Sequence, residues 1–170
     1  MDERQMHAVE IKAGVEAVWA EVTKLGLIHK PMFGTVLEAE LRPGGRLLYR
    51  SQDGKRVIII GEVLECDAPR RLVHTFRFTN LKDTPTRVEW TLDATPSGTR
   101  VTIVHSQFKD QQETYKGVLT SWPKILGDIA AVVETGDVPL GSRIRNALMN
   151  ALMFMMPKST LRENIDELKR

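Results

Sequence analysis

The chain has 170 residues, of which 42% are hydrophobic and 27% are charged, and its formal net charge is +2. This length and composition suit one soluble globular domain with a sizeable core. The net charge is too small to predict nucleic-acid binding, and the single cysteine excludes an intramolecular disulfide framework. The first residues are charged and lack the apolar region of a signal peptide. The longest mostly apolar run, residues 147–156, is too short for a membrane span of about 20 residues. We therefore expect a cytoplasmic protein.

The first part of the chain changes from a strand period to a helix period. Alternating apolar and polar residues predict a strand over residues 7–13. In residues 15–22 the apolar side chains recur at i, i+3, i+4 and i+7, which predicts an amphipathic helix. A turn or short helical segment is expected over residues 26–34.

The central part of the chain reads as a meander of hairpins. Runs that alternate or are rich in β-branched residues are separated by turns rich in glycine, proline and aspartate. The six predicted strands are residues 35–41, 46–51, 56–66, 71–78, 86–94 and 99–108. With the first strand they make seven, so the fold class predicted is α+β with an antiparallel sheet.

The helical period returns after Asp110 and extends to about Val133. Pro123 falls in this segment, so it either kinks a long helix or lies in the first turn of one that Ser121 caps. We expect residues 1–136 to form the main domain and residues 137–170 a helical extension.

The extension should contain two helices, with a break at Pro157. Thr160 and Glu163 have the spacing of a capping box, which would start the second of these helices.

No sequence motif indicates a metal site, a cofactor site or a catalytic residue. The four histidines are never within four residues of one another, and phosphate-binding and dinucleotide-binding glycine patterns are absent. We therefore predict no metal, no cofactor and no nucleic-acid partner.

Two histidines nevertheless fall on the apolar phase of predicted strands. If the hairpin turns are symmetric, His74 lies opposite Trp90, and His105 lies opposite Val88. The two imidazoles are then two strands and two residues apart, which is roughly 12 Å. Each is either a buried, hydrogen-bonded core residue, a polar contact for a ligand in an apolar cavity, or a general acid or base.

Aromatic side chains also gather on the predicted inward faces. They are either simply core residues or the lining of a pocket between a bent sheet and the long helix. The candidate ligand-binding residues are Trp19, Tyr49, His74, Phe76, Phe78, Trp90, His105, Trp122 and Leu126.

Several phrases resemble a known family: "AGVEAVWAEVT", "RPGGRLLYRSQDG", "GEVLECDAPRRLVHTF", "TRVEWTLDATPSGTRVTIVHSQF" and "GVLTSWPKIL". Over about residues 6–135 the chain is similar to the activator of heat-shock-protein-90 ATPase homologue family, within the START-like (SRPBCC) helix-grip superfamily. The resemblance implies a curved seven-stranded antiparallel sheet around a long C-terminal helix, with a hydrophobic cavity between them. The extension after that helix departs from the family pattern.

The leading hypothesis is therefore a non-enzymatic module that binds a small hydrophobic ligand, similar to a lipid or a polyketide. One alternative is a cyclase or hydrolase that uses His74 or His105 in the same cavity. Another is a co-chaperone or a dimeric interaction module.

The extension carries an apolar helical stripe over residues 142–156, which needs a cover. It could pack on the domain or on a second subunit, forming a homodimer. One candidate patch on the convex face of the sheet comprises Leu48, Ile58, Ile60 and Val73. The alternative is weak contact with a membrane surface, suggested by the flanking residues Arg143, Arg145 and Lys158.

Overall fold

The computed structural model describes residues 3–169 and contains one curved antiparallel sheet. Its strand order is β1-β8-β7-β6-β5-β4-β3-β2. The strands are β1 (Gln5–Ile11), β2 (Ile28–His29), β3 (Thr35–Ala39), β4 (Arg46–Arg50), β5 (Val57–Asp67), β6 (Arg71–Phe78), β7 (Thr86–Thr95) and β8 (Gly98–Ser106). The seven predicted strands are present. The eighth is the two-residue β2, which pairs with β3 in a segment predicted as a turn.

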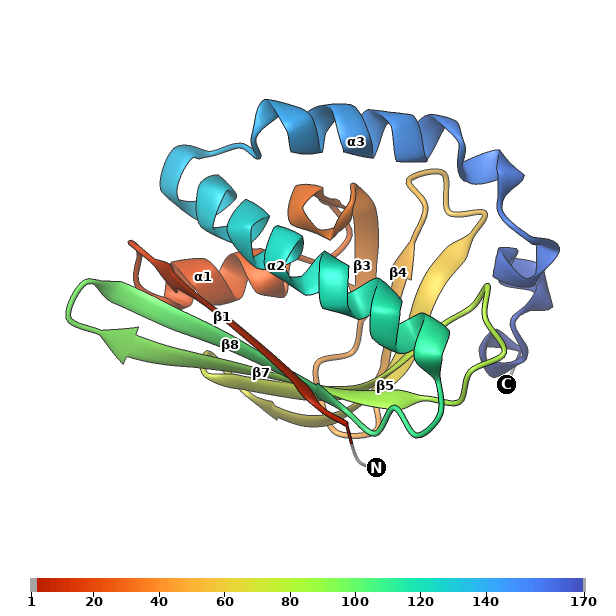
Figure 1. Cartoon of the computed structure of the whole chain (residues 1–170), viewed down its shortest axis with the longest axis horizontal. Coiled ribbons are helices and arrows are strands. Elements are labelled where there is room, and N and C mark those ends of the chain that lie inside the picture. Colours follow the sequence, from red (N-terminus) through yellow and green to blue (C-terminus); the bar gives the residue numbers. More distant parts are fainter. Residues whose placement is uncertain (1–2, 170) are drawn as a thin grey trace.

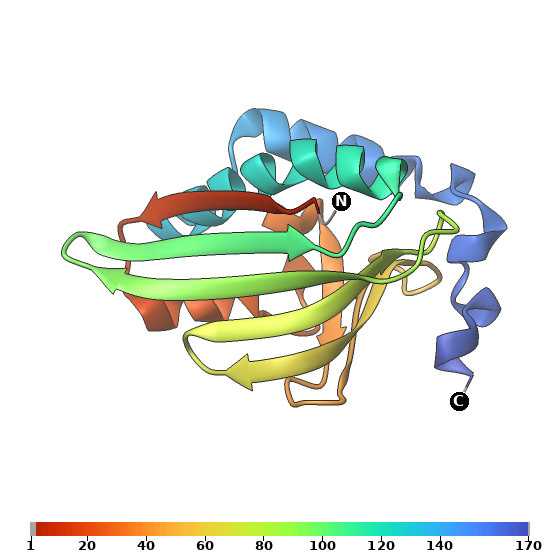
Figure 2. The same ribbon diagram turned by 60° about the horizontal axis from the view of Figure 1, so that its bottom comes forward.

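Helices lie on the inner side of this sheet (Figures 1 and 2). The helix α1 (Val15–Val22) follows β1 as predicted, and the short helix η1 (Lys30–Met32) follows β2. The long helix α2 (Gln112–Thr135) crosses the sheet, which confirms the helix-grip α+β fold. Pro123 lies inside α2, so of the two alternatives for this residue the first turn of a helix is excluded. The Ser121 hydroxyl donates to the carbonyl of Gly117 in the preceding turn of α2, 2.7 Å away, so Ser121 does not cap the start of a helix.

Apart from the start of β5, the inward faces of the strands agree with the predicted alternation, but one hairpin has a different register. His105 lies opposite Val88, as expected. His74 also lies opposite Val88 rather than Trp90. The connection between β6 and β7 is asymmetric because β6 continues pairing with β5 as far as Phe78. The two histidines are therefore in one row, two strands or about 10 Å apart.

The extension begins with α3 (Leu140–Ala151) and the short helix η2 (Met153–Met155). Three single 3-10 turns follow, namely η3 (Lys158–Thr160), η4 (Arg162–Asn164) and η5 (Asp166–Leu168). The prediction of a second helix with a capping box is therefore wrong. The Thr160 hydroxyl donates to the carbonyl of Pro157 and accepts from Arg56, so it is used to attach the tail to the sheet.

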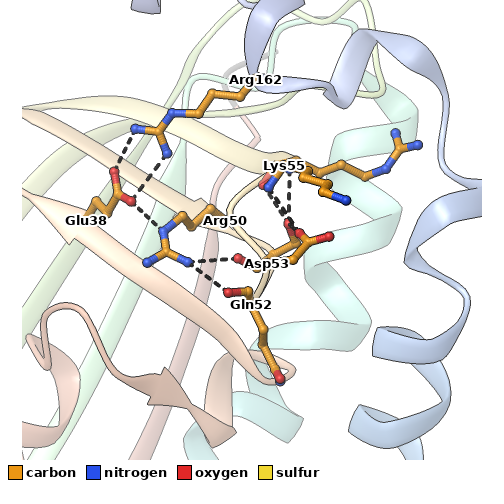
Figure 3. A network of polar contacts seen from close by, with 8 residues as sticks. Glu38, Arg50, Gln52, Asp53, Lys55 and Arg162 are labelled. Atoms are coloured by element: carbon orange, nitrogen blue, oxygen red, sulfur yellow. Dashed lines mark hydrogen bonds and ion pairs between the residues drawn. The ribbon is translucent and has the colours of Figure 1, made fainter.

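The tail covers the convex face of β4 and β5. Ile165 is 3% exposed and packs with Leu48, Val57 and Ile60. Arg162 of the tail and Arg50 of β4 both donate to Glu38 (Figure 3). Two residues of the predicted apolar patch, Leu48 and Ile60, thus have a cover, which comes from the tail and not from residues 142–156. Val73 is buried but is not part of this cluster.

Ile58 does not belong to that patch. A β-bulge interrupts the pairing of β4 with β5, because Tyr49 lies opposite Ile59 while Arg50 lies opposite Val57. The extra residue shifts the alternation, so Val57 takes the convex face and Ile58 faces the interior. Within residues 3–169, no helix combines the length and the apolar character that crossing a membrane requires.

Candidate ligand-binding cavity

An apolar cavity of about 290 Å³ lies where α2, α3 and η2 meet the inner face of β5 and β6. Its lining comes from segments far apart in the sequence, including residues on both sides of the boundary at residue 136. The lining residues are Met32, Phe33, Thr35, Ile58, Ile59, Phe76, Phe78, Val118, Ser121, Trp122, Ile125, Met149, Met153 and Met156.

The sheet wall of the cavity is built from β5 and β6. Successive residues of a strand point to opposite faces, so Phe76 and Phe78 lie on the same inner face. Their rings meet edge to face with centroids 4.9 Å apart. Ile59 lies opposite Phe78 in the neighbouring strand. The wall therefore presents ring faces and branched aliphatic groups, without a polar side chain.

Phe33 supplies the wall next to η1, and its backbone is in the left-handed region with φ of 58°. Such a conformation is uncommon outside glycine. It is held by the turn that follows, in which the amide of Gly34 donates to the carbonyl of His29. The guanidinium of Arg145 lies 4.6 Å from the centroid of the Phe33 ring. Phe33 thus contacts both the cavity and α3.

Three methionines of the extension close the remaining side. Met149 lies in α3, Met153 begins η2 and Met156 directly follows η2 with an extended backbone, and all three line the cavity. Methionine is unbranched and polarisable, and it adapts its shape to different apolar neighbours. The sequence pattern marked Met149 and Met153 only as part of a broad apolar stripe. Because the helix ends between Met149 and Met153, helical spacing alone does not identify these three residues as one group.

The polar atoms that reach the cavity already have local partners. The hydroxyl of Thr35 donates to the carbonyl of Met32, 2.7 Å away, and Ser121 donates to its own helix. None of the lining residues carries a titratable side chain. In the described part of the chain, no three histidine, cysteine or acidic side chains gather to hold a metal ion.

Behind the cavity, His105 fixes the orientation of Trp122. The indole Nε1 of Trp122 donates to Nδ1 of His105, 3.0 Å away. The Thr86 hydroxyl donates to the carbonyl of Phe76, so it accepts a hydrogen bond from Nε2 of His105 at 2.7 Å. One neutral tautomer, with the proton on Nε2, satisfies this arrangement.

His74 has the same relation to Trp90. The indole of Trp90 donates to Nε2 of His74 over 3.3 Å, and Nδ1 of His74 donates to the carbonyl of Thr75 over 2.8 Å. The rings of Trp90 and Trp122 then meet edge to face, with centroids 5.6 Å apart. Each imidazole therefore serves as the acceptor that a buried tryptophan requires.

Burial keeps both imidazoles neutral. It lowers the pKa of His74 from 6.5 to about 4, against the opposing effect of its hydrogen bond to the carbonyl of Thr75. Burial also lowers the pKa of His105 to about 3, and the nearby His74 and His7 add to this effect. Of the three alternatives for His74, the structure therefore matches the buried, hydrogen-bonded core residue.

A scan against protein families matches residues 12–134 to the family described as Activator of Hsp90 ATPase homolog 1-like protein. The chain belongs to this family. The match begins directly after β1 and spans α1, strands β2 to β8 and nearly all of α2, while α3 and the tail lie beyond it. No curated protein matches the sequence significantly.

Solved structures share the Activator of Hsp90 ATPase homolog 1-like fold. MLL2253 from Mesorhizobium loti is 23% identical with a TM-score of 0.68, and the match covers 80% of this chain and all 100% of that one. DynU16, a protein in the dynemicin biosynthetic locus, is 22% identical with a TM-score of 0.67. That match covers 81% of this chain and 49% of the DynU16 chain. CalU16 from Micromonospora echinospora is 22% identical with a TM-score of 0.52, and the match covers 89% of this chain and 85% of that one.

The nine residues predicted to bind a ligand separate into two groups in this family member. Phe76, Phe78 and Trp122 line the cavity. The others do not reach it: His74, Trp90, His105 and Leu126 are sealed in the core, Tyr49 is buried against His29, and Trp19 is half-buried on α1. All nine face inward, but the cavity occupies only one end of the inner face, under α3.

Proposed function

We propose that this protein binds a small apolar ligand in the cavity without catalysing a reaction on it. The observation that carries the proposal is the cavity itself, which is enclosed by aromatic, aliphatic and methionine side chains. Pockets of this kind, with few polar groups, are where small apolar molecules bind. Phe76, Phe78 and Trp122 would supply the rigid contacts, and the methionines the adaptable ones.

The lining also limits the ligand's chemistry. The volume of about 290 Å³ is at the small end of ligand pockets, which range from about 300 to 1,000 Å³. It suits a medium-length acyl chain or a small fused-ring aromatic. A charged group inside would lose its hydration and find no partner, so any such group of the ligand stays at the opening.

Binding is favoured over catalysis because the lining offers no acid or base. Each ring nitrogen of His74 and His105 is engaged in a hydrogen bond to a tryptophan, a threonine hydroxyl or a backbone carbonyl. Neither residue lines the cavity, so neither lies where it could reach a proton of a bound molecule.

The test uses the intrinsic tryptophan fluorescence, to which Trp122 of the cavity wall contributes together with Trp19 and Trp90, with 1-decanol and naphthalene as probes. Ser121→Phe should fill the cavity, whereas Thr120→Phe adds the same ring at the neighbouring, exposed position of α2. We expect saturable fluorescence changes for the wild type and Thr120→Phe, and at least about tenfold weaker binding for Ser121→Phe. Equal binding by both variants, or no saturable change in a folded wild type, would contradict the proposal.

A further inference from the structure

The segment that closes the cavity also carries an exposed apolar surface on its other side. None of the residues of α3 is buried. We define the outer ridge as six large apolar residues between residues 140 and 155 that are 45–73% exposed: Leu140, Ile144, Leu148, Leu152, Phe154 and Met155. Met149, which lines the cavity, is itself 41% exposed and is not counted in the ridge. Leu140, Ile144 and Leu148 are spaced by four residues within α3, so they form one line along the helix, and Leu152 follows directly after its end. The segment is thus apolar toward the cavity and apolar toward the outside.

Polar contacts hold this orientation from the inner edge of α3. Ser142 and Arg145 both donate to Asp128 of α2, at 2.8 and 2.9 Å. Asn146 donates to the carbonyl of Lys30, 2.8 Å away. These contacts direct Arg145 and Asn146 toward the body, whereas the side chains of the outer ridge are exposed. Figure 1 shows α3 at the edge of the molecule.

The far end of the segment is tied to the sheet. Arg56 donates to the carbonyls of Phe154 and Pro157, both 3.1 Å away. The rest of the tail then lies on the convex face, where Ile165 is buried. The tail residues are therefore committed elsewhere, and within residues 3–169 the outer ridge stays exposed.

The charges around the outer ridge distinguish between partners. From residue 138 to residue 161 the chain has three basic residues and no acidic one. Arg145 points inward and forms an ion pair with Asp128. The side chain of Arg143, near the start of α3, is 60% exposed and lies 4.0 Å from Asp137, which also forms an ion pair with Lys30. Lys158 is exposed beyond the other end.

A second copy of the chain fits this pattern poorly. In a twofold interface the same patch faces itself, so two outer ridges would bring basic ends together without an acidic partner in the segment. An anionic lipid surface offers apolar depth for the ridge and negative charge for its basic ends. The helix α3 has 12 residues and is about 18 Å long, which suits a position along the surface.

We propose that the outer ridge docks on an anionic phospholipid surface, with α3 lying in the interfacial plane. Leu140, Ile144 and Leu148 would enter the boundary between headgroups and acyl chains, while Arg143 and Lys158 contact the headgroups. Because the methionines on the opposite side of the same segment line the cavity, docking brings the cavity next to the lipid. The contact is reversible, since one short amphipathic segment binds weakly.

The test is co-sedimentation of the full chain with phosphatidylcholine vesicles, with and without phosphatidylserine. The ridge variant is Ile144→Gln with Leu148→Gln. The matched control makes the same change at two exposed apolar residues outside the extension, Met6→Gln with Leu64→Gln. Thermal unfolding confirms that each variant is folded.

We expect the wild type and the matched control to bind vesicles containing phosphatidylserine, more weakly as salt is raised. The ridge variant should bind at least about tenfold more weakly. Ser121→Phe, which fills the cavity, should bind vesicles like the wild type, so this result is independent of ligand binding. The proposal is overturned if the wild type ignores anionic vesicles or if both double variants lose binding equally. It is also overturned if native mass spectrometry shows a dimer that only the ridge variant dissociates.

Discussion

The inner side of the sheet has two regions that differ in how their side chains are held. In the sealed region, between α2 and strands β6 to β8, tryptophan and histidine rings are joined by directional hydrogen bonds. In the open region, under α3, methionine and aliphatic side chains meet without such bonds and leave a cavity. Trp122 belongs to both, because its indole N–H is fixed by His105 while its ring forms part of the cavity wall. The comparison teaches that a rigid wall and an adaptable wall together can make a binding site.

The largest effect should come from removing the residue that the two regions share. Trp122→Ala should lower the free energy of unfolding by about 3–5 kcal/mol, as for a large aromatic removed from a core. It also leaves Nδ1 of His105 without its donor. Trp19→Ala should cost clearly less because Trp19 is only half-buried. Urea denaturation measures the unfolding free energy of both variants. Equal losses would show that Trp122 contributes no more to stability than the half-buried Trp19.

The next test compares one residue from each region. Leu126→Ala in the sealed region should cost about 2–5 kcal/mol, because a core of fixed side chains relaxes little around a new void. Met153→Ala in the open region should cost well below that, because it enlarges an existing cavity at a half-buried position. Urea denaturation of the two variants decides the point. Similar losses would mean that the open region is packed as tightly as the sealed one.

The sealed region should also be sensitive to acid. The folded protein keeps His105 neutral down to pH of about 3, whereas the unfolded chain binds a proton near its ordinary pKa of 6.5. The contribution of His105 to the free energy of unfolding is therefore complete above pH 6.5. It falls as the pH decreases from 6.5 toward 3, by about 1.4 kcal/mol per pH unit.

The matched variants for the acid effect are His105→Gln and His7→Gln. Glutamine can accept from Trp122 and donate to Thr86 but does not titrate, so His105→Gln should flatten the dependence between pH 6 and pH 4 by roughly that slope. His7 is only partly buried, so His7→Gln should change the pH dependence of the unfolding free energy less than His105→Gln does. Chemical denaturation across this pH range gives the slopes, and identical slopes in wild type and His105→Gln would be inconsistent with a neutral His105.

Local patterns in the sequence were sufficient to predict an α+β fold with an antiparallel sheet and most of the inward faces, whereas the helix-grip arrangement came from the resemblance to the family. They also gave the correct register for β7 and β8, because the two strands are joined by a tight turn. They did not give the register of β6 and β7, since the connection there is asymmetric for a reason that lies in β5. The bulge at Ile58 depends in the same way on a neighbouring strand.

The candidate site was less predictable than the fold. Alternation identifies inward residues such as His74 and Phe78, but it does not say which of them meet α2 tightly and which face a gap. That distinction depends on where α3 returns over the sheet, and the return is fixed by contacts between residues far apart in sequence, such as Arg145 with Asp128. The methionine spacing in the extension was present in the sequence, but only the fold shows which surface it faces.

The buried carboxylate of Asp128 has a consequence for the family as a whole. It lies on the long helix, within the region common to family members, but its partners Ser142 and Arg145 lie in the extension beyond that region. In a chain that ended after the helix, this carboxylate would lose both partners together with the cover that α3 gives it, so the aspartate would make neither contact. Homologues should therefore gain or lose these positions together. An aspartate at this point of the helix would then identify, from sequence alone, relatives whose extension folds back over the cavity.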